Sequence, residues 1–175
     1  FYPVRLDVAV DRAFLVAGTA SSWNGPSLFV IDTSRPNEPV LLGHSHPMMA
    51  SIAAMALLDD HVIIGGSYGR RDETYVARMW VFDVSDPASP SQAALIEFDG
   101  WVTDIAVSGD LVYVSDGSFD DGGIRIYDFT QPDRPVFIDR FPTIGWAPEE
   151  IEIGGEVLFA IDRPDFYVLS LEDPH

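Results

Sequence analysis

A phrase that recurs along the chain constrains the fold more than any other feature. Each copy is an apolar run that ends in aspartate, with prolines four and seven residues later. The three aspartates are Asp32, Asp83 and Asp128, and the prolines that follow them are Pro36 and Pro39, Pro87 and Pro90, and Pro132 and Pro135. A fourth copy, residues 166–175, has Ser170 in place of the aspartate. The copies follow one another at intervals of 51, 45 and 42 residues, a period that indicates a repeat architecture.

A second repeated pattern precedes each of these phrases. Residues 8–18, 56–66, 106–117 and 152–162 each read as an apolar run, a short polar or glycine turn and another apolar run. Asp59-Asp60, Gly109-Asp110 and Gly154-Gly155 supply the residue types that tight hairpin turns need. Each repeat therefore predicts a hairpin, a third strand that ends in aspartate, a proline-rich turn and a fourth strand. Four short antiparallel strands in about 45 residues are typical of a β-propeller blade.

The proline phrase has a mechanical role in such a blade. The aspartate can accept a backbone N–H bond from the residue two positions on, as in an Asx turn. The first proline favours a turn, and the second opens an outer strand whose missing N–H can face solvent. Met79 and Val81 alternate with Trp80 and Phe82, so both faces of this strand are apolar. We therefore expect each sheet to be buried between two neighbouring sheets.

These phrases resemble the LVIVD repeat, a propeller-type repeat of bacterial and archaeal proteins, many of them exported or attached to the cell surface. The resemblance is carried by "LFVIDTSRPNEPVLLG", "MWVFDVSDPASP" and "IRIYDFTQPDRPVFI", and it extends over essentially the whole chain in four copies. It implies a propeller fold and an extracellular, cell-surface or periplasmic location. It implies no particular reaction, since the family is defined by its repeat.

The expected fold is one all-β unit of four consecutive four-stranded antiparallel blades. The repeats span about residues 1–49, 50–99, 100–145 and 146–175, and the last lacks its outer strand. We expect this unit to be a segment of a larger propeller of about six to eight blades. Other blades of the same parent chain would then be among its partners. A compact ring of four blades is the alternative.

The composition excludes several classes of partner. The chain has 28 acidic and 10 basic residues, which give a net charge of −18. That charge argues against nucleic acid or an anionic membrane surface as a partner. The most apolar stretch, residues 48–58, is too short to cross a bilayer, so no membrane insertion is expected. The absence of cysteine excludes disulfides, thiol catalysis and thiolate metal sites.

Most of the candidate binding residues lie in the connections between strands and between blades, which we expect at one end of the blades. Large aromatic side chains beside carboxylates suit a glycan or protein partner. The candidates for such a site are Trp101, Trp146, His46, Asp104 and Glu150. The alternative is that the tryptophans fill gaps between blades and the acids cap strands. His44 and His46 could both face one side, but the spacing identifies no third metal ligand, which favours a surface pair.

One acidic loop offers the only cofactor candidate, a weak calcium site. Asp116, Ser118 and Asp120 alternate as the oxygen ligands of calcium loops do. The following glycine comes one position late for an EF-hand loop, and no glutamate follows at position twelve. A solvated acidic turn is the alternative.

The chain shows none of the common catalytic motifs. It contains no Gly-x-Ser-x-Gly elbow, phosphate-binding loop or dinucleotide fingerprint, and no spacing nominates a nucleophile. The sequence therefore favours a non-enzymatic binding or scaffold module. The alternative is a propeller hydrolase or lyase that uses acids and histidines at the channel mouth. Such an enzyme would need convergent titratable groups with perturbed pKa values.

Overall fold

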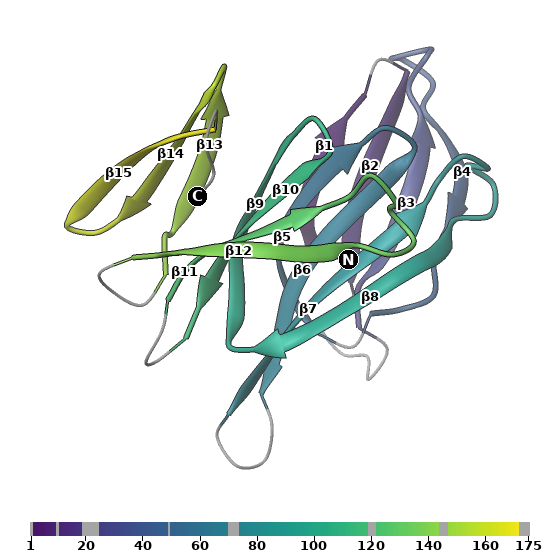
Figure 1. Cartoon of the computed structure of the whole chain (residues 1–175). Helices are drawn as coiled ribbons and strands as arrows, with labels where there is room; N and C mark the ends of the chain where they lie inside the picture. The colour runs from purple at the N-terminus through teal and green to yellow at the C-terminus, as the bar shows by residue number, and fades with distance from the viewer. Residues whose placement is uncertain are drawn as a thin grey trace.

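The computed structural model of the chain describes residues 2–9, 11–18, 25–48, 50–69, 74–118, 122–143 and 147–171. Within these ranges the chain forms fifteen β-strands and no helix, and the strands pair into four antiparallel sheets (Figure 1). No helix among these residues is long and apolar enough to span a membrane. The all-β prediction is therefore confirmed.

Consecutive strands of the chain make up each sheet. The first sheet consists of β1 (Tyr2–Val8), β2 (Arg12–Gly18), β3 (Ser27–Asp32) and β4 (Val40–His44). The second consists of β5 (Ser51–Leu58), β6 (His61–Gly69), β7 (Tyr75–Asp83) and β8 (Ser91–Asp99). The third consists of β9 (Trp101–Ser108), β10 (Leu111–Gly117), β11 (Gly123–Asp128) and β12 (Val136–Pro142). The fourth has three described strands, β13 (Glu150–Gly154), β14 (Val157–Asp162) and β15 (Asp165–Ser170).

The hairpin turns between the first two strands repeat in detail. Asp59, Gly109 and Gly155 occupy equivalent turn positions in the second, third and fourth sheets, with φ of 49°, 55° and 66°. This left-handed conformation explains why the sequence has glycine or aspartate there. The turn then receives a backbone bond from the residue that follows the third strand. These bonds are Val84 N–H to Asp60 O at 2.9 Å and Phe129 N–H to Asp110 O at 2.7 Å.

The repeated aspartates form the expected Asx turns at the ends of the third strands. Asp32 and Asp83 accept the N–H of Ser34 and Ser85 at 2.8 Å, and Asp128 accepts the N–H of Thr130 at 2.7 Å. In each turn the hydroxyl and the backbone N–H of the serine or threonine donate hydrogen bonds to the aspartate. These bonds lower the pKa of all three carboxyl groups. The turn therefore stabilises the charged form of each aspartate.

Each internal sheet is buried on both faces, as the apolar alternation predicts. In β6, Val62 and Ile64 pack against the first sheet, whereas Ile63 between them packs against the third. In the third sheet, Val112 belongs to the core shared with the second sheet. Its neighbour Tyr113 belongs to the core shared with the fourth. Three apolar layers of this kind join the four sheets in chain order, which is how blades pack in a propeller.

The first strand of each sheet lies on the inner side of the array. β1 contacts β5, β5 contacts β9, and β9 contacts β13, so these strands run next to one another. The last strands β4, β8 and β12 form the outer edges of their sheets. Figure 1 shows the first and fourth sheets at opposite sides of the molecule, with the second and third between them.

Candidate functional site

An aromatic pair joins the second and third sheets at the end where β6 leads to β7, β8 to β9 and β10 to β11. This end is called the loop end below, and the end with the hairpin and Asx turns is called the turn end. The rings of Tyr75 and Trp101 meet edge to face, with centroids 6.0 Å apart at an interplanar angle of 73°. Tyr75 is 44% exposed and Trp101 is half-buried. The pair therefore offers aromatic surface to solvent while spanning two sheets.

Backbone geometry fixes the position of the Trp101 ring. The chain enters β9 through Gly100, whose φ of 112° disfavours any residue with a side chain. The indole then lies against Gly117 on the neighbouring strand β10. A Cβ at Gly117 would stand 2.1 Å from two atoms of the ring, so only glycine leaves room for it. The third sheet thus holds Trp101 in one place.

A guanidinium group lies on the same strand as Tyr75, three residues further along β7 and on the opposite face of the second sheet. The Cζ of Arg78 stands 4.4 Å from the centroid of the Tyr68 ring, a cation–π geometry. Its Nε also bonds Oε1 of Glu97 at 2.7 Å. The loop end of the second sheet therefore presents an ordered cation and a further aromatic ring.

The calcium hypothesis depends on Asp116, which the structure places in an ion-pair network. Its side chain is completely buried, and Oδ2 lies 2.6 Å from Nε of Arg125 and 3.5 Å from Nε of Arg140. Ser118 follows, half-buried, and Asp120 lies outside the described residues. Within the described part of the chain, no group of three acidic or histidine side chains could hold a metal ion. The calcium site stays a prediction, but arginines already balance the charge of its first carboxylate.

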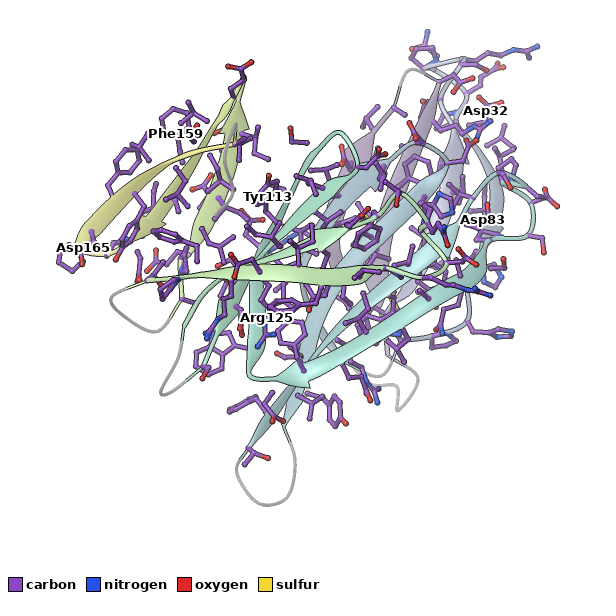
Figure 2. All side chains as sticks on the ribbon, viewed as in Figure 1. Asp32, Asp83, Tyr113, Arg125, Phe159 and Asp165 are labelled. Carbon is purple, nitrogen blue, oxygen red and sulfur yellow. The ribbon has the colours of Figure 1, made fainter. Side chains whose placement is uncertain are left out.

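Arg125 also ties the third sheet to the second. Its Cζ stands 4.4 Å from the centroid of the Phe98 ring on β8. Figure 2 shows Arg125 in the interior of the sheet array, between strands of the two sheets. Asp116 therefore anchors a cation that packs across the boundary between them.

Asp104 and Glu150 lie at the junction of the third and fourth sheets. Asp104 Oδ1 accepts the N–H of Ile105, and its Oδ2 accepts the N–H of Ile151 on β13, both at 2.9 Å. The Thr103 hydroxyl donates to the carbonyl of Pro148 at 2.6 Å. Glu150 precedes Ile151 and is exposed. Asp104 thus holds the edge of the fourth sheet, while Glu150 is open to solvent.

His46 lies in a different connection, between the first and second sheets. It is exposed, and its carbonyl accepts a bond of 2.9 Å from the hydroxyl of the buried Ser45. The same hydroxyl accepts the N–H of Leu28 at 3.0 Å. His44 instead contacts the ring of Phe29 in a tilted arrangement, with centroids 5.9 Å apart. The two histidines therefore have different surroundings.

The predicted ligand-binding residues are thus spread over two junctions and the aromatic pair. Trp146 lies outside the described residues, so its place beside Trp101 stays a prediction. Tyr75 was not among the predicted residues, although it joins Trp101. The signal that could have identified it is an aromatic residue at the border between a long polar connection and a buried strand.

A hollow of about 200 Å³ lies at the opposite, turn end of the second and third sheets. Its lining includes Asp59, Asp60, Asp110, His61 and the buried ring of Phe129. It presents acids but no exposed aromatic face on which a sugar or peptide could stack. The loop end is therefore the better candidate for recognition.

Comparisons with known proteins support the repeat and the fold. A family model of the LVIVD repeat matches residues 72–94 and 99–143. The crystal structure of the computationally designed Ika4 protein superposes with a TM-score of 0.70 at 12% sequence identity. The match covers 97% of this chain and 91% of that protein, and at such low identity it concerns the fold alone. A search of curated proteins gave no match.

Proposed function

We propose that this chain, a β-propeller-type protein of the LVIVD-repeat family, is a non-enzymatic binding and scaffold module of an exported or cell-surface protein. Its partner is a glycan or another protein, bound at the loop end. The repeated sheets provide a rigid frame, and the connections between strands present the binding groups. The net charge of −18 makes neutral or cationic partners more favourable than nucleic acid.

The observation that carries this proposal is the aromatic pair of Tyr75 and Trp101. Aromatic faces supply large contact area at a small cost in conformational entropy, and they suit sugar rings and peptide side chains alike. Gly117 and the edge-to-face contact hold the pair in place before a partner arrives. Preorganisation of this kind favours binding because little freedom is lost on contact.

Several acidic side chains form hydrogen bonds and ion pairs within the fold, which favours a binding function over a catalytic one. Both oxygens of Asp104 accept backbone N–H bonds, and Asp116 is paired with Arg125 and Arg140. The carboxyl groups with lowered pKa values belong to Asx turns at the turn end. A general acid or base needs a free proton-transfer site within reach of a substrate. These carboxylates serve the fold instead.

Parallel arrays of glycans and of extracellular proteins test this function. The variant is Tyr75→Ala, and the matched control is Phe137→Ala, because Phe137 is 48% exposed but lies toward the turn end. We expect Tyr75→Ala to weaken binding at least tenfold, as loss of a central aromatic contact does, and the control to bind like the wild type.

Two results would contradict the proposal. One is equal weakening by Tyr75→Ala and Phe137→Ala. The other is turnover of a bound compound that Asp104→Asn or Glu150→Gln abolishes, which would support the hydrolase or lyase alternative. The array class that gives the signal decides between glycan and protein.

A further inference from the structure

Each of the first three sheets turns the same positions toward the sheet that follows it. Counted from the hairpin turn and from the repeated aspartate, these positions carry mostly apolar side chains. They are Phe14, Val16, Leu28 and Val30 in the first sheet, Ile63, Gly65, Met79 and Val81 in the second, and Tyr113, Ser115, Ile124 and Ile126 in the third. None of these side chains is more than 5% exposed, because the next sheet covers them.

The fourth sheet carries the same kind of face, but nothing in the described chain covers it. Its residues at these positions are Phe159, Ile161, Phe166 and Val168, and they are 37–60% exposed. The rings of Phe159 and Phe166 stack with centroids 6.0 Å apart. Figure 2 shows Phe159 on the side of its sheet away from the third sheet and Tyr113. This set of four residues is called the fourth-sheet face.

The first sheet exposes the complementary kind of face, the one that internal sheets turn toward the sheet before them. Leu6 and Val8 on β1 are 64% and 60% exposed. The equivalents of Leu6 and Val8 in the second sheet are Met55 and Leu57, which pack into the core shared with the first sheet. Leu6 and Val8 are called the first-sheet face.

We propose that the first-sheet face of one copy of this chain binds the fourth-sheet face of a second copy, head to tail. The contact would continue the series of three inter-sheet interfaces, with the same apolar positions on each side. One chain cannot form it alone in this arrangement, because its first and fourth sheets lie at opposite sides of the molecule (Figure 1). A second copy carries both missing halves, and two reciprocal contacts would close a ring of eight sheets, within the usual range for propellers.

Burial of the two apolar faces would drive the association of two copies, and the net charge of the copies opposes that association. Apolar faces of this kind are uncommon on monomeric proteins and mark interaction surfaces. Each copy carries a net charge of −18, so two copies repel each other at low ionic strength. We therefore expect association to tighten when salt is raised. The proposal concerns a surface other than the loop end and does not depend on the proposed function.

Light scattering after size exclusion, over 1–100 μM protein at 0.15 and 1 M NaCl, tests the proposal. The wild type should reach twice the 19.3 kDa mass of one chain. Two variants each block one face: Leu6→Glu with Val8→Glu, and Phe166→Glu with Val168→Glu. Each alone should stay at the mass of one chain, and an equimolar mixture should regain a two-chain species, since one intact face of each kind remains.

The control is Val136→Glu, which introduces the same charge at an outer-strand valine that is 59% exposed, against 58% for Val168. It should associate like the wild type. Far-UV circular dichroism checks that each variant folds, and Phe166→Ser replaces the fourth-face variant if that one unfolds. A monomeric wild type at both salt concentrations would overturn the proposal and favour cover by other blades of a longer parent chain. Association of the Leu6 and Val8 variant alone would also overturn it, because it would show like faces pairing.

Discussion

Asp116→Asn should destabilise the fold strongly, because the aspartate is a buried anion shared by two arginines. Its carboxylate is wholly buried, with Oδ2 at 2.6 Å from Arg125 and 3.5 Å from Arg140. Asparagine keeps the size and shape but removes the charge. Two guanidinium groups at the boundary of the second and third sheets would then lose the charge of this carboxylate.

The magnitude follows from the burial of the three partners. Removal of one member of a fully buried ion pair costs about 3–5 kcal/mol. The side chains of Arg125 and Arg140 are 22% and 20% exposed, so water recovers part of that loss. We expect a fall of about 2–4 kcal/mol in the free energy of unfolding. For a chain of this length that corresponds to a fall of roughly 5–15 °C in Tm.

Urea titration followed by tryptophan fluorescence measures this change, with Glu97→Gln as the matched control. Glu97 bonds Arg78 at 2.7 Å, a similar distance, but its side chain is 47% exposed. Exposed ion pairs contribute at most about 1 kcal/mol, so the control should lose far less. Equal losses in the two variants, or a loss below about 0.5 kcal/mol for Asp116→Asn, would refute the reasoning from burial.

Two further predictions concern the turns and the aromatic pair. The pKa values of Asp32, Asp83 and Asp128 are lower in the folded chain, so their stabilising effect is full above the unfolded pKa and is lost as pH falls through the folded value. As the pH is lowered below about 4, the urea concentration at the midpoint of unfolding should therefore decrease, and it should decrease less in the triple Asp→Asn variant. Parallel pH profiles of the two proteins would contradict this. Gly117→Ala should displace the Trp101 ring, cost about 1–3 kcal/mol and shift the tryptophan emission; an unchanged spectrum and stability would show that the ring is not held there.

The local chemistry of the repeat could be predicted from the sequence because each device needs only neighbouring residues. A hairpin turn at Asp59-Asp60 depends on left-handed φ, and an Asx turn at Asp83 depends on a donor two residues away. The alternation of Val62, Ile63 and Ile64 between two cores follows from the period of a strand with both faces covered. These features repeat, so each copy supports the interpretation of the others.

The candidate site was harder to predict because its contacts join different repeats. The bond from Ile151 N–H to Asp104 spans 47 residues and depends on how two sheets pack. The pairing of Asp116 with Arg140 depends on strand register across a bulge in the third sheet, which composition does not specify. The acids were therefore predicted as ligand groups, whereas the structure gives Asp104 and Asp116 bonds within the fold.

Recognition at the loop end is tested most directly by NMR of ¹⁵N-labelled protein titrated with a partner found on the arrays. The indole N–H signal of the half-buried Trp101 should shift in proportion to saturation, while that of Trp80, which is 4% exposed in the core, should stay in place. After prolonged incubation, the spectrum of the partner should show the same signals as at the start. A shift of Trp80 without Trp101, or the appearance of product signals, would contradict a non-enzymatic binding site at the loop end.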